Sequence, residues 1–280
     1  MRSLLLGWAV LAACGQVNPQ RDAADPPSGD AALGAWSTPV PVAELNGPSI
    51  DQDPTLTADG LQVVFVSDRP GALGADDLWS ATRATPGAPF GAPTLIPNVS
   101  SASSEQHPWI SPDGLLMYFS SDRAGTSDIF VTVRASRTAP WSTPSAVAEL
   151  NTPSLEQVGG MTADLLTFAF VSDRSGPTTG RDIYISTRST LTSPWSLPVV
   201  VTELATPGIE SAPVFAGQGT AIYFVRDSDL YVADRIGGAI GAPRKIEELS
   251  TPSAEGDPHV TEDQRTLLFS RDADIYISTR

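Results

Sequence analysis

A chain of 280 residues, 41% hydrophobic and 18% charged, has the composition of a globular protein with a sizeable core. Its 17 basic and 32 acidic residues give a formal net charge of −15, which argues against a nucleic-acid partner and against adsorption to anionic lipid. The single cysteine agrees with a core that needs no disulfide.

The amino terminus, residues 1–13, is predicted to be a signal peptide. Arg2 precedes an apolar run from Leu4 to Ala13, and about ten apolar residues are too few to span a bilayer. The residues Leu11-Ala-Ala-Cys14 resemble the lipobox of bacterial lipoproteins, which implies cleavage before Cys14 and lipidation of its thiol. The alternative is an ordinary signal peptide with an incidental cysteine. The proline-containing residues 14–35 have no apolar period and are expected to form a flexible tether.

From residue 36 to residue 280 the chain repeats one unit five times. A phenylalanine that ends a strand-length apolar run recurs at spacings of 54, 51, 54 and 45 residues, at Phe65, Phe119, Phe170, Phe224 and Phe269. Periods of this length indicate a propeller or a solenoid. Each copy reads as four short strands with tight turns such as Asp113-Gly114, and no stretch has a long helical period. We therefore predict an all-β, five-bladed β-propeller of four-stranded antiparallel blades.

The two ends of the repeats predict how the ring closes. The first copy begins near Trp36, whereas the chain stops at Arg280 after a strand that no tryptophan segment follows. We expect the amino-terminal strand to pair with the carboxy-terminal blade, because closure removes two exposed sheet edges.

Three motifs carry a resemblance to a known family. The turn Ser111-Pro-Asp-Gly114, the run Phe119-Ser-Ser-Asp-Arg123 and strands such as Asp274-Ile-Tyr276 resemble the WD40-like (PD40) repeats of TolB-type periplasmic propellers. The resemblance covers roughly residues 36–280 and implies a propeller of the cell envelope. TolB itself has six blades and a further amino-terminal domain, so an interaction with the Tol–Pal system is not implied.

A carboxylate precedes or begins the inner strand of every copy, at Asp51, Glu105, Glu156, Glu210 and Glu255. In a closed ring these groups are expected to form an acidic collar near one end of the channel. One interpretation is a site for a cation or a basic peptide, because converging negative charge focuses the field in a cleft. The preferred interpretation is structural, since a feature present in every blade answers a need of every blade.

Positions at which the copies disagree are better candidates for function, because the blade itself does not require them. Five divergent residues from two inner-strand columns fall on blades five, one and two, which are contiguous in a closed ring: Asp53, His107, Trp109, Asp257 and His259. We predict that they form a ligand-binding site at the channel mouth. The intervening inner-strand column, which is Leu56 in the first copy and Val260 in the last, is apolar in all five copies and is assigned to the core.

No catalytic residue, cofactor or metal is predicted. The recurring Ser-Asp-Arg trio, as at Ser121 to Arg123, has no accompanying histidine and suits backbone hydrogen bonding at a strand end. Two histidines and two aspartates are metal-ligand types, but their spacing matches no metal motif.

These observations predict a non-catalytic, lipid-anchored envelope propeller that acts as a binding scaffold. In the lipoprotein family a glycine after the cysteine, here Gly15, favours the outer membrane, on its periplasmic side or at the cell surface. The expected partner is another envelope protein or a peptide, the only expected membrane contact is the lipid, and the chain is expected to be a monomer. The alternative is a glycan-active hydrolase in which Asp53 and Asp257 lie about 5–10 Å apart and Trp109 supports the sugar.

Overall fold

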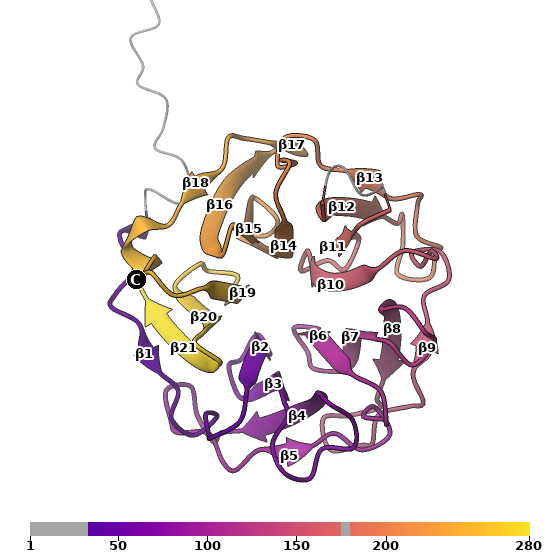
Figure 1. The fold of residues 1–280 in the computed structure, drawn as a ribbon, viewed down its shortest axis with the longest axis vertical. Helices are drawn as coiled ribbons and strands as arrows, with labels where there is room; N and C mark the ends of the chain where they lie inside the picture. Colours follow the sequence, from indigo (N-terminus) through magenta and orange to yellow (C-terminus); the bar gives the residue numbers. More distant parts are fainter. Residues whose placement is uncertain (1–32, 175–179) are drawn as a thin grey trace, which may run out of the picture.

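Five antiparallel sheets stand around a central axis in the computed structural model, which describes residues 33–174 and 180–280 (Figure 1). Each sheet is one blade, and its first strand lies nearest the axis. The prediction of a five-bladed all-β propeller is confirmed. The predicted signal peptide, Cys14 and nearly all of the predicted tether lie outside the described residues.

The blades follow one another around the axis in chain order. From the axis outward, blade one contains β2 (Asp51–Leu56), β3 (Gln62–Ser67), β4 (Asp77–Thr82) and β5 (Thr94–Leu95). Blade two contains β6 (Glu105–Ile110), β7 (Leu116–Ser121), β8 (Asp128–Val133) and β9 (Ser145–Ala146). Blade three contains β10 (Glu156–Met161), β11 (Thr167–Ser172), β12 (Asp182–Thr187) and β13 (Val199–Val200).

The last two blades differ in their outer strands. Blade four contains β14 (Glu210–Ala216), β15 (Ala221–Arg226) and β16 (Asp229–Ile236), and two short strands pair with β16, namely β17 (Ala239–Ile240) and β18 (Arg244–Lys245). A 3-10 helix, η2 (Glu247–Leu249), leads into blade five. Blade five contains β19 (Glu255–Val260), β20 (Thr266–Arg271), β21 (Asp274–Thr279) and β1 (Val40–Pro41). Within the described ranges, no helix has the length and apolar character needed to traverse a bilayer.

Side chains of alternating strand residues fill the interfaces between blades. Five separate apolar clusters form, one at each of the five blade–blade interfaces. The five recurring phenylalanines have no exposed surface, because each lies on the second strand of its blade, between the inner strand and the third strand. The repeat period seen in the sequence is therefore the period of these interfaces.

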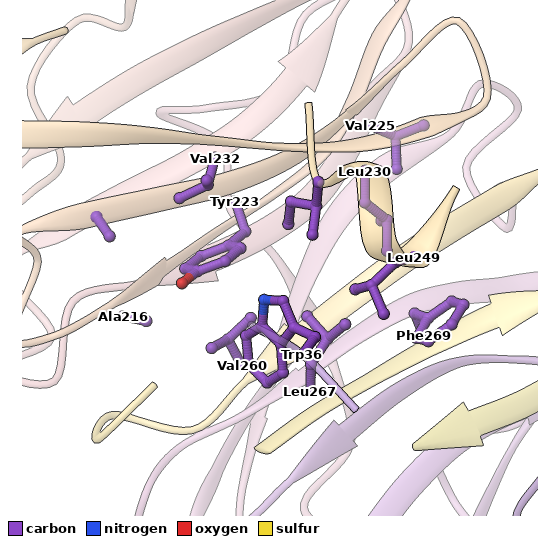
Figure 2. Packing of buried hydrophobic residues seen from close by; sticks show 12 residues of the cluster. Trp36, Ala216, Tyr223, Val225, Leu230, Val232, Leu249, Val260, Leu267 and Phe269 are labelled. Carbon is purple, nitrogen blue, oxygen red and sulfur yellow. The ribbon is translucent and has the colours of Figure 1, made fainter. Parts of the chain in front are cut away.

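The ring closes as the sequence predicts. Strand β1 pairs with β21, with Val40 opposite Ile277 and Pro41 opposite Tyr276. Trp36 packs into the cluster between blades four and five, next to Val260 and Leu267 (Figure 2). The outer strand β1 ends at Pro41, because the chain then turns and the Leu45 N–H donates to the Val42 carbonyl (2.9 Å).

Candidate functional site at the propeller axis

The inner strand of every blade contains one register shift, and in four blades this bulge brings a residue with positive φ to the axis. These four residues each precede a proline: Asp53 (φ 54°), His107 (φ 49°), Ala212 (φ 48°) and Asp257 (φ 50°). Proline cannot donate to the sheet ladder, and a positive φ is costly for a residue with a Cβ, so the surrounding sheet must hold this geometry. Bulges of this kind redirect side chains next to functional sites.

Blade three is the exception. Gly159 stands where the other blades have proline, and Val158 keeps its ladder position opposite Phe170. A Cβ added to Gly159 would lie 2.3 Å from the Pro213 carbonyl oxygen, so the neighbouring inner strand approaches too closely for any side chain. Blades three and four thus contribute only the apolar Val158 and Ala212 to the axis, which leaves the polar side chains on the other three blades.

The five predicted ligand-binding residues all line one cavity of about 30 Å³. Strands β2, β6 and β19 supply them, and β10 and β14 supply the apolar wall. A volume of this size admits a water molecule or an ion but no sugar ring. The structure therefore gathers the predicted residues, and their ligand-binding role stays a prediction.

Three of these residues form a compact cluster. One potential ligand atom from each of Asp53, His107 and Asp257 lies within 4.8 Å of the others. The His107 backbone N–H donates to Asp53 Oδ2 (2.9 Å), and the two aspartate carboxyl groups hydrogen-bond to each other. This contact is closer than the spacing of about 5–10 Å that the glycan-hydrolase alternative requires.

Ser270 in β20 supports the cluster, and sequence reasoning missed it. Its hydroxyl accepts the Asp53 backbone N–H (3.1 Å) and donates to the Asp257 carboxylate. A signal was present, because the same middle-strand position is valine in three other blades, as at Val66. A comparison of the copies along the second strand of each blade, in addition to the inner strand, therefore identifies Ser270 as a divergent position.

Burial controls the protonation of both carboxyl groups. Burial raises the pKa of Asp257 well above its ordinary value, and the negative charge of Asp53 raises this pKa further. Burial also raises the pKa of Asp53, although hydrogen bonds from Asp257 and from the His107 N–H oppose that rise. The pair therefore favours one proton shared between the two groups, with Asp257 as the donor.

The two histidines differ in their surroundings. Burial lowers the pKa of His107, and its Nδ1 atom is buried with no hydrogen-bond partner among the described residues. Burial lowers the pKa of His259 to about 4, so this imidazole is neutral at pH 7. His259 lines the same cavity but lies outside the three-residue cluster.

Trp109 is held by the core. Only 7% of its surface is exposed, and it packs with Tyr118 and Met161 between blades two and three. It touches a second cavity of about 460 Å³, which the first cavity adjoins at Trp109, Val214 and His259. The indole therefore offers an edge to the channel and no broad surface on which a sugar could stack.

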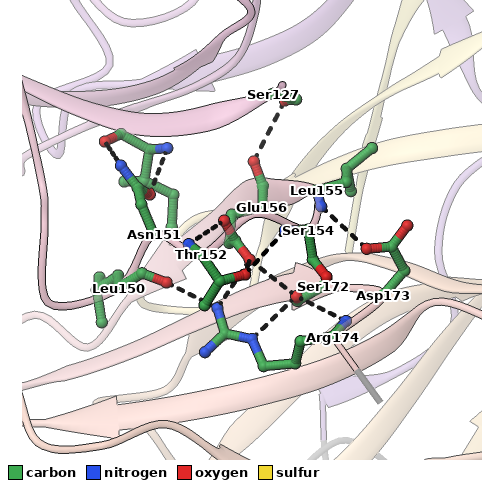
Figure 3. Close-up of polar contacts among 11 residues, drawn as sticks. Ser127, Leu150, Asn151, Thr152, Ser154, Leu155, Glu156, Ser172, Asp173 and Arg174 are labelled. Carbon is green, nitrogen blue, oxygen red and sulfur yellow. Dashed lines mark hydrogen bonds and ion pairs between the residues drawn. The ribbon is translucent and has the colours of Figure 1, made fainter. Parts of the chain in front are cut away.

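The predicted acidic collar is buried beneath the loops that precede the inner strands. In blade three, Glu156 receives Arg174 (3.0 Å) and the backbone N–H and hydroxyl of Thr152 (2.9 and 2.6 Å), and Arg174 also donates to the Leu150 carbonyl (2.7 Å) (Figure 3). Every blade repeats the ion pair within itself: Asp51–Arg69, Glu105–Arg123, Glu156–Arg174, Glu210–Arg226 and Glu255–Arg271. At most 1% of any collar carboxylate residue is exposed, so these residues present no acidic surface to the channel.

The Ser-Asp-Arg trio belongs to the same network. In blade three the Ser172 hydroxyl accepts hydrogen bonds from the backbone N–H and side chain of Arg174 (3.1 and 3.0 Å). Asp173 accepts the Leu155 backbone N–H (2.9 Å). Each member of the trio thus holds a loop against its blade.

Fold and site together define a five-bladed β-propeller with a titratable cluster on its axis. No protein-family model matches the chain, and no curated protein matches its sequence. Among solved structures, a TolB-type protein from Agrobacterium tumefaciens is similar, with a TM-score of 0.53, 18% identity, and coverage of 85% of this chain and 79% of that one.

Enzymes share the fold to the same degree. An α-L-arabinofuranosidase from Lactobacillus brevis has a TM-score of 0.54 and 14% identity over 86% of this chain and 94% of that one. A gluconolactonase from Xanthomonas campestris has a TM-score of 0.52 and 10% identity over 90% and 92% of the two chains. Identities this low show the fold alone.

The comparisons correct one prediction. The resemblance of the repeats to TolB-type propellers predicts a non-catalytic protein, but the similar structures include an α-L-arabinofuranosidase and a gluconolactonase. The repeat residues build the blades and their interfaces, which binding proteins and enzymes of this fold share, so the repeats do not distinguish the two.

Proposed function

We propose that this chain is a cell-envelope propeller that binds a ligand, a peptide or a segment of another envelope protein, at the channel around Asp53, His107 and Asp257. The observation that carries the proposal is the unequal distribution of titratable side chains around the axis. The inner strand bulges in every blade, yet titratable side chains occupy the bulge only on the three contiguous blades five, one and two. A scaffold requirement would place the same kind of residue in every blade, as the carboxylates of the collar show.

The ligand-binding proposal is tested by affinity capture from envelope extracts. The bait is the full chain, compared with an Asp257→Ala/His107→Ala double variant. Ala212 already occupies the same bulge in blade four, so alanine suits this backbone. The control is Val199→Ser, a change at an exposed outer strand far from the axis. We expect a partner that wild type and the control retain and the double variant loses; equal capture by all three contradicts the proposal.

We further propose that the propeller is anchored by lipid on Cys14. The lipobox-like residues Leu11 to Cys14 and the short apolar run before them support this. We expect wild type to partition with membranes and Cys14→Ser to become soluble after signal cleavage. A Cys14→Ser variant that still partitions wholly with membranes contradicts the anchor.

Hydrolysis is a second candidate function, favoured by two carboxyl groups in contact beside an imidazole. These are the groups that serve as general acids and bases. The ring of a substrate would occupy the adjoining cavity of about 460 Å³. The test is a panel of aryl glycosides and lactones, assayed with wild type, Asp53→Asn and Asp257→Asn. We expect turnover of at least one substrate class by wild type and its loss in both variants; activity that survives both substitutions contradicts a role for the pair.

A further inference from the structure

Three blades converge on one point of the axis with the donor atoms of a metal site. We propose that Asp53, His107 and Asp257 bind a divalent transition-metal ion, with Zn²⁺ as the type, and leave coordination positions open toward the channel. The metal would lie at the proposed ligand-binding site, and its role in binding a partner rests on the proposed function. Geometry, charge and one unsatisfied atom support it.

The geometry requires only small adjustment. The three candidate donor atoms lie within 4.8 Å of one another. Donors at about 2.1 Å from a tetrahedral ion are about 3.4 Å apart, so the donor atoms must approach one another by up to about 1.4 Å. Rotation of the two carboxylates supplies such a change, because each has two oxygens and a broad terminal torsion. The backbone need not move.

The charge of the cluster calls for a cation. Neither Asp53 nor Asp257 forms an ion pair with arginine or lysine within residues 33–174 and 180–280. Every buried collar carboxylate has its own arginine, and the buried Asp77 accepts the backbone N–H groups of Leu73 and Gly74. Buried charges in proteins are paired or coordinate a metal. A divalent ion neutralises both aspartates at once.

His107 supplies the second observation. Its Nδ1 atom is buried and has no hydrogen-bond partner in the described part of the chain. An orphaned buried polar atom in a native structure calls for an explanation, and an ion is one of the few. The neutral imidazole that burial favours is also the form that ligates metals.

The space and the donor set narrow the ligand. The cavity of about 30 Å³ accommodates an ion with a bound water, whereas a larger organic ligand would occupy the adjoining cavity of about 460 Å³. A mixed set of imidazole and carboxylates suits Zn²⁺, Co²⁺ or Mn²⁺ better than the all-oxygen ions Ca²⁺ and Mg²⁺. Three protein ligands leave a position for water or for an oxygen of the bound partner.

The test uses metal alone. The untagged chain, carrying Cys14→Ser so that its single thiol binds no zinc, is stripped with chelator and titrated with ZnCl₂ in a calorimeter. We expect one ion per chain, with CaCl₂ binding more weakly. His107→Ala and Asp257→Ala are each expected to weaken zinc binding by more than the roughly 10–100-fold that loss of an outer-shell partner costs. Thermal melting without metal verifies that each variant is folded.

Asp59→Ala is the control for Asp257→Ala, because Asp59 is an exposed carboxylate outside the cluster and outside the cavity of about 30 Å³. We expect it to bind zinc as wild type does. Absence of zinc binding by folded wild type overturns the inference, and so does equal weakening by Asp257→Ala and Asp59→Ala. If a partner from the envelope extract is captured in the absence of metal and zinc does not bind, the metal site is refuted while the proposed function stands. If zinc binds but no partner is captured, the metal site stands and the proposed function is refuted.

Discussion

The collar and the axis both bury carboxylates within a few residues of each other on the same strands, yet they are built in opposite ways. In blade five, Glu255 receives Arg271 (2.9 Å) and the Thr251 hydroxyl, and every other blade has an equivalent pair. Two residues further along β19, Asp257 meets another carboxyl group in place of a cation. A carboxylate that recurs in every blade with its own arginine indicates a structural role. A carboxylate that is present in only some blades and has no arginine partner indicates a functional site.

The largest effect should come from breaking a collar pair. Glu156→Gln leaves Arg174 without its charge partner and weakens the anchoring of the 150–156 loop, so we expect a loss of about 3 kcal/mol in the free energy of unfolding. Urea denaturation followed by tryptophan fluorescence measures it.

The collar comparison has an internal control. Glu156→Gln/Arg174→Met should recover part of the lost stability, because replacing both partners leaves no uncompensated charge. A single variant as stable as wild type would mean that the collar pairs are not structural.

An intermediate effect of opposite sign is expected at the axis. Because the pKa of Asp257 is higher in the folded than in the unfolded chain, the folded state binds the extra proton between the two pKa values. Stability of the metal-free protein therefore falls as pH rises above about 4, the ordinary pKa of aspartate, toward the folded pKa. Asp257→Asn keeps a donor toward Asp53 without the charge, and should be more stable than wild type at pH 8 by on the order of 1 kcal/mol.

Urea melts in chelator at pH 4, 6 and 8 measure this axis effect. The difference between Asp257→Asn and wild type should grow with pH and be near zero at pH 4. Parallel pH profiles for the two proteins would show that Asp257 is not the buried titrating group.

The smallest effect on the free energy of unfolding should come from a carboxylate that belongs neither to the collar nor to the axis cluster. Asp59, on the turn after β2, pairs with Arg137 at the surface, where their side chains are 40% and 34% exposed. Asp59→Asn should cost less than about 1 kcal/mol, and the cost should shrink in 0.5 M salt, since exposed pairs are weak and screened. A loss as large as that of Glu156→Gln would erase the distinction between buried and exposed pairs.

Much of the site could be read from the residues alone. The recurring phenylalanines indicated the blade period, Trp36 indicated the closure, and divergence among copies indicated Asp53, His107 and Asp257. The bulge geometry could not be read, because an Asp-Pro or His-Pro pair permits several backbone conformations and the neighbouring strands select the positive φ. Divergence marks Ser270 as a position, but its contact with Asp53 could not be predicted, since this contact crosses the closure between blades five and one.

The sequence by itself determined the number of blades, the composition of each interface and the set of positions that differ between copies, because local strand patterns and turn residues repeat with the fold. Only the tertiary structure decided which carboxylates are paired. The collar and the axis look alike as acidic positions two residues apart on one strand, and alternation would place both on one face. The bulge carries the axis residue away from the arginine that neutralises the collar, and ring closure then brings Asp53, His107 and Asp257 together.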